Sequence, residues 1–426
     1  MNITSIVEKY ASAFKLYAWY YHNIRHRRSN RSPGNGTGNQ MQIVESIDEW
    51  VQSLEEKGCR IYGKDILMGY GKAKTDITLF VSHELSLSGA PVALFHFAVM
   101  MCKKNRKSII ISPEDGHLGP YALKHNVPVI VIPELFNTDY ILGVRKMFSQ
   151  IVVSTLVGFP VIKLLNGTDS SVIWWIHECA QIYSRNMAEQ MPWIVDDNIH
   201  IFCGGAYARK MLKKRFPRYK TKLLLYCTDD LTKRESDKKE KIRQDRAIPT
   251  YACVALIEKR KGQDILIRAI DMLPEEVRKN CCFIFVGKSA DVEMRKIIAE
   301  KAAKNQEQII FYEGLGIEEL YDLYEEIDYL ICPSRDDPMP VVVAEALSLG
   351  KPCICSKNTG SAAVIKGFHA GFCYGHDDPR RLAELIVKTN RVSDDCYDKL
   401  SINARAAYES TFSEKVFEEN VLKICL

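Results

Sequence analysis

The chain has 426 residues, a net charge of +5 at pH 7, 26% charged residues and 46% hydrophobic residues. This length allows two or three domains, and this composition is typical of globular proteins with a large core. The net charge is too small to indicate a nucleic-acid-binding protein. The most apolar stretch, 148–165, contains Gln150, Pro160 and Lys163, which excludes it as a transmembrane span.

Fourteen cysteines are scattered along the chain, and no pair has the C-x-x-C spacing. Zinc sites commonly use that spacing, so we expect neither zinc nor another resident metal. Many free thiols without a signal peptide indicate a reducing compartment, which predicts a cytoplasmic protein.

The first 75 residues differ in pattern from the rest of the chain. Within residues 1–28, apolar side chains recur at three- and four-residue steps and predict an aromatic helix with a basic end. A linker rich in Ser, Gly, Asn and Pro follows at 30–39, and a second helix is expected at 43–57. The first helix either lies on the inner face of an anionic membrane or packs on its own domain, and the pattern leaves both interpretations open.

From Asp76 onwards, short apolar strands alternate with helices. Strands are predicted at 77–81, 109–111, 128–132, 151–153, 172–176 and 201–202, and, after a charged stretch at 229–246, at 251–256, 282–286, 309–312, 329–332 and 353–355. This alternation is typical of parallel sheets covered by helices on both faces. We therefore predict an α/β fold of two tandem, doubly wound, Rossmann-like domains with a cleft between them.

The predicted boundaries divide the chain into three parts. These are a helical N-terminal extension with linker at 1–75, a first Rossmann-like domain at 76–235 that is completed by a C-terminal helix at 408–426, and a second Rossmann-like domain at 248–407. Ligands of such sheets bind outside the carboxyl ends of the strands. The loops at these ends are therefore the candidate site.

The segment 336–352 carries the most specific local signal. Pro340 suits the first position of a helix. Met339, at the predicted N-cap, has no side-chain oxygen for the first-turn N–H groups, so this helix start is free to bind a phosphate. Asp337 lies in the loop beside that end, and Glu345 lies in the second turn of the helix. A surface helix with two solvated acids is the alternative interpretation.

A basic loop follows the first strand of the second domain and contains Lys259, Arg260 and Lys261. Cations at this position can neutralise a diphosphate, and the loop is expected at the same sheet edge as Asp337. A basic surface turn is the alternative, and we favour it for Lys259. Gly314 ends another strand of this domain, where a glycine lets a base lie against the backbone.

Two loops of the first domain complete the candidate site. The strand at 77–81 leads into a turn with Gly89 and Pro91, which allows close backbone approach and then starts a helix. The turn lacks the G-x-G-x-x-G spacing of a dinucleotide site. The strand at 172–176 leads into His177, which is either a hydrogen-bonding partner for a substrate or a structural histidine.

These segments, in this order, resemble a family 4 glycosyltransferase of the GT-B architecture. The matching motifs are 88–91, 174–178, 257–264, 333–349 and 359–360. The resemblance runs from about residue 77 to the C-terminus and leaves the first 75 residues without a counterpart. It implies an acceptor domain first and a nucleotide-sugar donor domain second.

The resemblance also implies the reaction, a retaining and metal-independent hexosyl transfer from a nucleotide-diphospho-sugar to a glycan or lipid-linked acceptor, for cell-surface polysaccharide synthesis. The implied catalytic residues are Lys261, which holds the diphosphate with Arg260, Asp337, which contacts the donor sugar, and His177, which hydrogen bonds it. The implied donor-binding groups are the helix N-terminus at Met339, Pro340 and Val341 for the phosphates, Glu345 for the ribose, Gly89 for domain closure and Gly314 for the base.

Elementary chemistry supports these roles. Negative charge develops on the diphosphate as the anomeric C–O bond breaks, and preorganised cations and amides stabilise it. The leaving group then needs no metal, and the donor is a co-substrate rather than a resident cofactor.

Two positions depart from the family pattern. Asp337 stands where the family commonly has Glu, and Ala255-Leu256 stands where many members have Gly-Arg, which leaves Arg260 as the second cation. Two other functions remain open, a sugar-nucleotide epimerase of the same fold and a non-catalytic partner that binds sugar nucleotides. No nucleic-acid partner is expected.

Overall fold

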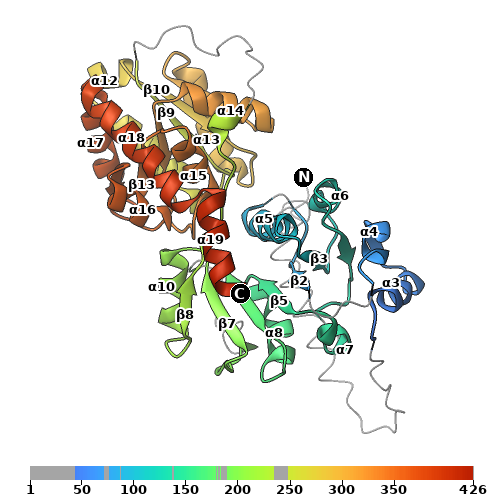
Figure 1. The fold of residues 1–426 in the computed structure, drawn as a ribbon. Coiled ribbons are helices and arrows are strands. Elements are labelled where there is room, and N and C mark those ends of the chain that lie inside the picture. Colours follow the sequence, from blue (N-terminus) through green and yellow to red (C-terminus); the bar gives the residue numbers. More distant parts are fainter. Residues whose placement is uncertain are drawn as a thin grey trace, which may run out of the picture.

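The computed structural model describes residues 44–71, 76–86, 88–136, 139–178, 180, 183, 190–234 and 248–425. The helix predicted within residues 1–28 and the linker predicted at 30–39 lie outside these residues. Figure 1 shows two α/β domains, with the first half of the chain in the lower domain and the second half in the upper one. Each domain has its own sheet, so the predicted fold of two tandem, doubly wound domains is confirmed.

The first domain contains an eight-stranded sheet in the order β1-β4-β3-β2-β5-β6-β7-β8. Its strands are β1 (Arg60–Tyr62), β2 (Ile77–Val81), β3 (Lys107–Ser112), β4 (Val129–Val131), β5 (Gln150–Ser154), β6 (Val172–Ile176), β7 (Ile199–Cys203) and β8 (Thr221–Leu223). Its helices include α3 (Ile47–Glu56), α4 (Lys64–Met68), α5 (Gly89–Lys103), α6 (Leu118–Lys124), α7 (Tyr140–Val144), α8 (Phe159–Leu165) and α10 (Ala206–Arg215). The central strands β2, β5 and β6 pair in parallel and are buried along their whole length, as their apolar runs predict.

Residues 44–71 join this sheet instead of forming a separate extension. β1 pairs with β4 in antiparallel orientation, which corrects the prediction of a purely parallel sheet. α3 buries a stripe that includes Ile47, Trp50 and Leu54 in the core of the first domain. The predicted extension at 1–75 therefore contains elements of the first domain. The sequence pattern missed β1 because it is only three residues long and lies partly exposed, without an apolar run.

The second domain contains a six-stranded parallel sheet in the order β11-β10-β9-β12-β13-β14. Its strands are β9 (Thr250–Val254), β10 (Cys282–Val286), β11 (Ile309–Tyr312), β12 (Tyr329–Cys332), β13 (Cys353–Ser356) and β14 (Gly371–Tyr374). Its helices are α11 (Gln263–Asp271), α12 (Glu275–Lys279), α13 (Val292–Lys304), α14 (Ile317–Glu326), α15 (Val341–Ser348), α16 (Ser361–Phe368), α17 (Pro379–Asn390) and α18 (Asp394–Thr411). The sequence did not predict β8 and β14, which are short edge strands with only partial burial.

The chain passes between the domains at two neighbouring places. α18 packs on α15 and α16 in the second domain, whereas α19 (Glu414–Cys425) places Phe417 5.7 Å from Phe97 and 5.9 Å from Trp175 in the first domain, between ring centroids. The predicted last helix is thereby confirmed. The segment predicted to complete the first domain, 408–426, begins inside α18. The other passage is the segment that follows β8 and contains Thr228. The Thr228 N–H donates to the carbonyl of Phe412, between α18 and α19, at 3.0 Å, so the two passages are hydrogen-bonded to each other.

The exact end of the first domain stays a prediction, because residues 235–247 lie outside the described part of the chain. Among the described helices, none combines the length and the apolar character needed to cross a bilayer.

Candidate active site

The loops at the carboxyl ends of the two sheets meet where the domains touch. Gly89 starts α5 and lies against the first residue of α15, since a Cβ at Gly89 would lie 3.8 Å from Val341 Cγ2. From the loop after β6, the Ala180 N–H donates to Asp336 Oδ1 at 3.2 Å. The structure therefore brings the Gly89 turn and the segment 336–341 together, as their places in the two sheets predict.

Helix α15 begins without a side-chain cap. Its N-cap is Pro340, with φ −65° and ψ 122°, and Val341 is its first helical residue. The predicted cap at Met339 is therefore wrong by one position, because the ψ of Pro340 is extended and not helical. Proline has no N–H, so Pro340 cannot be one of the main-chain donors. The free N–H groups of this helix start with Val341.

Met339 is buried and acts as an anchor for the loop ahead of α15. Its carbonyl accepts a hydrogen bond from Tyr226 OH at 3.1 Å, and its sulfur lies 3.3 Å from Ser361 Oγ. Tyr226 belongs to the segment that leads out of the first domain. Met339 thus ties the start of α15 to the junction between the domains.

An ion pair joins the two loops of the second domain that the sequence singled out. Lys261 Nζ lies 2.6 Å from Asp337 Oδ2, and the two side chains are only 18% and 5% exposed. Gly262, which follows Lys261, has φ +74°, and a Cβ there would lie 2.2 Å from Pro333 O. The basic loop approaches the segment after β12 so closely that only glycine fits at this position.

Arg335 clamps the same two loops together. Its guanidinium donates to both oxygens of Asp264, at 2.7 and 2.6 Å, and to Lys259 O at 2.7 Å. It also reaches Asp377 Oδ1 at 3.1 Å. Such a fork fixes the orientation of both partners. The sequence showed Arg335 within a matched motif, but nothing in its spacing revealed that it points back to the basic loop.

Arg260, the predicted second cation, is already engaged, with one partner in its own loop and one in the segment after β12. It donates to Glu258 Oε1 at 2.7 Å and to Asp336 O at 3.0 Å. Lys261, rather than Arg260, is the cation that meets the Asp337 carboxylate.

Glu345 lies in the second turn of α15, where Tyr324 OH donates to its Oε2 at 2.9 Å. Burial raises the pKa of Glu345 to about 7, and the nearby Asp229 carboxylate adds to the shift. A carboxyl group with this pKa changes its charge near neutrality. Tyr324 comes from α14, and the sequence analysis did not identify it, because a tyrosine in an amphipathic helix looks like any core residue.

His177 directly follows β6 and is half-buried, and its ring centroid is 4.4 Å from that of Trp175. Burial lowers its pKa to about 3, with His83 adding to the shift, so the imidazole is neutral at physiological pH. Within the described residues, His177 Nε2 and His83 Nδ1 are buried without a hydrogen-bond partner. A neutral imidazole can donate from one nitrogen and accept at the other. These two rings therefore hold unused hydrogen-bonding capacity.

Glu178 supports this part of the site. Its carboxylate accepts hydrogen bonds from the backbone N–H groups of Leu156 at 2.7 Å and His177 at 3.0 Å. Burial raises the pKa of Glu178 to about 7. Glu178 therefore fixes the loop that carries His177. The sequence analysis did not predict this role, and it did not identify His83, in the loop after β2, as a candidate site residue.

Gly314 follows β11 with φ +111°, a backbone conformation that favours glycine. A Cβ there would lie 3.4 Å from Lys288 Cγ. Gly314 thus lies at the predicted edge of the second sheet, beside Lys288 and not beside the Lys261–Asp337 pair.

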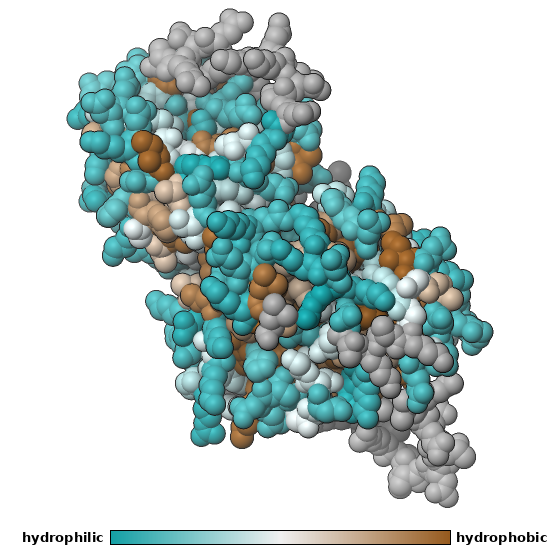
Figure 2. Space-filling view, in the orientation of Figure 1, coloured by the Kyte–Doolittle hydropathy of each residue, from teal (hydrophilic) through white to brown (hydrophobic). Residues whose placement is uncertain are grey.

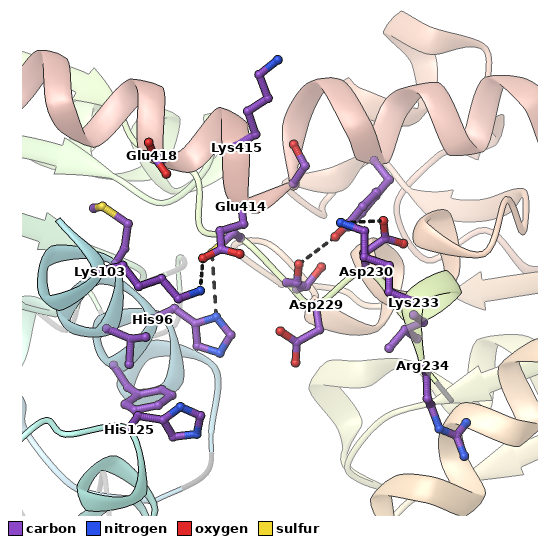
Figure 3. A pocket seen from close by; sticks show the side chains of 18 of the residues that line it. His96, Lys103, His125, Asp229, Asp230, Lys233, Arg234, Glu414, Lys415 and Glu418 are labelled. Carbon is purple, nitrogen blue, oxygen red and sulfur yellow. Dashed lines mark hydrogen bonds and ion pairs between the residues drawn. The ribbon is translucent and has the colours of Figure 1, made fainter. Parts of the chain in front are cut away.

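A cavity of about 900 Å³ lies between the domains (Figure 3). One wall is a cluster of rings from α5 and the α6 region, in which Phe95, Tyr121 and His125 have centroids 5.1–5.3 Å apart. Figure 3 shows Asp229 on the connecting segment opposite these helices, Asp230 turned toward Lys233, and Glu414 of α19 bonded to Lys103. Asp229 also acts on the pKa of Glu345, so the cavity lies close to α15. This cavity lies between the domains, as the predicted cleft does, but none of the predicted site residues, all of which lie in the described part of the chain, lines it.

Family models match both domains. The model described as glycosyl transferases group 1 matches residues 232–406, and that described as glycosyl-transferase family 4 matches residues 74–198.

Curated relatives match over shorter stretches. Granule-bound starch synthase 1 of Triticum aestivum is 24% identical over 131 residues, which are 30% of this chain and 21% of the relative. D-inositol 3-phosphate glycosyltransferase of Xylanimonas cellulosilytica is 24% identical over 159 residues, which are 37% of this chain and 38% of the relative. The matched part is thus well under half of the length of each relative.

Solved glycosyltransferases share the fold over most of the chain. HepE of Anabaena, in complex with UDP and glucose, has a TM-score of 0.67 at 17% identity and covers 82% of this chain and 98% of its own. WaaG, a glycosyltransferase involved in lipopolysaccharide biosynthesis, has a TM-score of 0.62 at 16% identity and covers 82% and 99%. Identities this low establish the fold alone. Together with the family matches over both domains, they show that this chain belongs to the family 4 glycosyltransferases of the GT-B architecture.

Proposed function

We propose that this protein is a retaining hexosyltransferase that moves a sugar from a nucleotide-diphospho-sugar to a glycan or lipid-linked acceptor in cell-surface polysaccharide synthesis. The observation that carries the proposal is the Lys261–Asp337 ion pair in the loop that leads into the uncapped start of α15. A cation, a carboxylate and free main-chain N–H groups in one place suit a ligand that carries both phosphates and sugar hydroxyls.

The second domain would hold the donor. Lys261 and the N–H groups that begin with Val341 would bind the diphosphate, and Asp337 would accept a hydrogen bond from a hydroxyl of the donor sugar. Glu345, held by Tyr324, would accept from the ribose, and the glycine at 314 would leave room for the base. Arg335 positions Lys261 by clamping its loop, and the engaged Arg260 keeps a supporting role.

The first domain would face the sugar and the acceptor. His177 is neutral and has an unused nitrogen, so it can hydrogen bond a sugar hydroxyl without adding charge. Gly89 lies against Val341, so the domains can close on the phosphates with little steric cost. Closure excludes water, which would otherwise hydrolyse the donor.

The chemical step breaks the anomeric C–O bond, and its electron pair stays on the diphosphate oxygen. Lys261 and the helix N–H groups stabilise this charge, which is the largest contribution that a site of this kind supplies. The departing phosphate takes the proton of the acceptor hydroxyl on the same face of the sugar, and the new bond forms there with retention. We propose that no metal takes part, because the cation and amides already serve the leaving group.

The neighbours in fold support this choice of donor. HepE of Anabaena has been solved with UDP, with UDP-glucose, and with UDP and glucose, and WaaG takes part in lipopolysaccharide biosynthesis. Both build on the same architecture as this chain.

A donor panel tests the proposal. The purified protein is incubated with UDP-, GDP- and ADP-sugars, and free nucleoside diphosphate and the sugar products are measured. Slow release of nucleoside diphosphate from one donor, faster with a suitable glycan acceptor, is the expected result. Formation of an epimerised donor would instead support the epimerase alternative. Thermal stabilisation by a donor without any turnover would support a non-catalytic sugar-nucleotide-binding partner.

We propose a cytoplasmic location, which agrees with the free thiols of the described cysteines. Contact of residues 1–28 with the inner face of the membrane stays a prediction.

A further inference from the structure

One end of the first domain combines exposed apolar side chains with a dense set of cations. Trp193 and Ile194, in the loop before β7, are 68% and 66% exposed. The neighbouring segment from α10 to β8 contributes exposed lysines and arginines at Lys210, Lys213, Lys214, Arg215, Arg218, Lys220 and Lys222. We call Trp193, Ile194 and these cations the 193–222 surface.

Contacts with Phe216 and Tyr219 hold the loop that carries Trp193 and Ile194 in place. Tyr219 OH donates to Pro192 O, directly ahead of the pair. The Trp193 ring lies 6.4 Å from the Phe216 ring in an edge-on arrangement, and Phe216 stacks on Tyr219 at 4.9 Å. Phe216 and Tyr219 are themselves buried, at 3% exposure each. The exposure of Trp193 and Ile194 is therefore a built feature of this loop.

Among the described residues, the ion pairs do not include the cations of this surface, although Asp196 and Asp197 lie exposed in the loop before β7. No Asp or Glu occurs between residues 198 and 228. Throughout the described part of the chain, ion pairs involve cations elsewhere, such as Lys279 with Glu275 and Arg295 with Glu313. The second domain thus pairs many of its surface cations, whereas the 193–222 surface keeps an excess of positive charge over Asp196 and Asp197.

Both kinds of side chain line one hollow. The lining of a cavity of about 820 Å³ includes Trp193 and Ile194 together with four cations and two acids, which are Lys213, Arg218, Lys220, Lys222, Asp196 and Asp197, so the cations are in excess. Figure 2 shows hydrophilic surface (teal) over α10 and β8 with apolar surface (brown) at the lower tip of this domain. The apolar and the cationic groups therefore face the same partner.

We propose that the 193–222 surface docks the protein on an anionic phospholipid bilayer. Tryptophan sits at the level of the headgroups with its apolar face toward the lipid, and lysine and arginine side chains bind the phosphates beside it. A nucleic-acid duplex or a purely acidic protein surface would pair with the cations but would leave Trp193 and Ile194 in water. The apolar pair is therefore what distinguishes a bilayer from those partners.

The location connects this surface to the cleft. α10 starts next to Gly205, where a Cβ would lie 2.7 Å from Pro338 O, and it ends at Arg215 in the 193–222 surface. Ten helical residues rise about 15 Å. The bilayer would thus lie about one short helix from the loops that carry Asp337, which suits an acceptor presented on a lipid.

Vesicle sedimentation with the full-length protein tests the proposal. Vesicles contain phosphatidylglycerol and phosphatidylcholine in equal parts, or phosphatidylcholine alone. The protein is expected to pellet with the anionic vesicles, to release at high salt, and to bind the neutral vesicles at least tenfold more weakly. Failure to bind anionic vesicles would overturn the proposal.

Two double variants separate the apolar from the cationic contribution. W193S/I194S and K213E/K220E are each expected to lower the partition coefficient at least tenfold. The matched control K124E/K304E makes the same change in net charge at exposed lysines of α6 and α13, and it should bind within threefold of the wild type. Unchanged thermal melting and donor hydrolysis show that each variant is folded.

Two outcomes count against the proposal. If W193S/I194S binds the anionic vesicles like the wild type, the apolar pair does not enter the bilayer, and the proposed mode of docking is wrong. If the control weakens binding as much as K213E/K220E does, net charge alone accounts for binding, and the assigned surface is wrong. Either result leaves the proposed glycosyl transfer untouched.

Discussion

The two domains prepare their halves of the site in opposite ways. In the second domain the groups are charged and paired in advance, as Lys261 with Asp337 and Arg335 with Asp264. In the first domain the groups are neutral and half-buried, and His83 and His177 keep unused nitrogens. A charged diphosphate needs fixed charges, whereas a sugar needs hydrogen bonds without net charge. Under the proposed function, this difference would suit the second domain to the diphosphate and the first domain to uncharged hydroxyl groups.

The largest expected effect comes from substitutions of the charged groups of the second domain. Lys261→Ala and Glu345→Ala should each lower donor turnover by about 10²–10³-fold or abolish it, because they remove groups assigned to the diphosphate and the ribose. Release of nucleoside diphosphate measures turnover, and circular dichroism checks the fold. Lys259→Ala is the matched control from the same loop and should stay near wild-type activity. Normal turnover in the Lys261 variant would show that Lys261 does not hold the diphosphate and that the site is assigned wrongly.

The next effect tests positioning. Arg335→Lys keeps the charge but loses the fork that holds both oxygens of Asp264, so Lys261 is held less firmly. We expect kcat to fall by about tenfold or more, with a smaller change in KM for the donor. Arg268→Lys changes an exposed arginine that contacts Asp264 and Asp377, and it should have little effect. Equal losses in both variants would mean that the network contributes only bulk stability.

The third effect compares one buried acid from each domain. The pKa values of Glu345 and Glu178 are raised to about 7 from 4.5, so the native state binds more protons than the unfolded state between those values. Stability contributed by each protonated carboxyl is fully present below about pH 4.5 and is lost as the pH rises through about 7. For each carboxyl, the free energy of unfolding falls by about 3 kcal/mol once the pH is above the raised pKa.

Denaturant unfolding at pH 5 and pH 7.5 measures this dependence in the wild type, Glu345→Gln and Glu178→Gln. Each variant should show a smaller loss of stability toward pH 7.5 than the wild type. His83 and His177 have lowered pKa values and act in the opposite direction below about pH 6.5, so the comparison rests on differences from the wild type. A variant with the same pH slope as the wild type would show that its carboxyl does not titrate in this range.

The smallest expected effect concerns metal. If Lys261 and the start of α15 stabilise the leaving diphosphate, chelation with EDTA should leave donor turnover within about twofold of the untreated enzyme. Turnover is measured before and after chelation and again after Mg²⁺ or Mn²⁺ is added back. Loss of activity that a divalent cation restores would mean that a metal shares the role given to Lys261.

The sequence predicted the architecture well because buried parallel strands leave continuous apolar runs. β6, β10, β11 and β12 lie at the residues that those runs indicated. The sequence did not predict the edge strands β1, β8 and β14, because their partial exposure interrupts the apolar pattern. The antiparallel pairing of β1 could not be predicted because the strand itself was not recognised.

The candidate site was predictable only in part. The local chemistry of 336–352 indicated an uncapped helix, and the structure agrees, although the cap is Pro340 and not Met339. The link between Arg335 and Asp264 joins residues 71 positions apart and leaves no local pattern. Burial gives Glu178 and His177 their altered pKa values, and burial at a single polar residue cannot be inferred from its neighbours in the sequence. The roles of the predicted site residues remain for the experiments above.

The hydrogen bond between Thr228 and Phe412 has a mechanical consequence. Both passages of the chain between the domains run through this one joint, and Tyr408 OH adds a second bond to Thr228 O at 2.8 Å. Groups near this joint would move little if the domains open, whereas groups far from it would move the most. We therefore expect a substitution that stiffens this joint to slow domain opening and product release without changing any residue assigned to the donor.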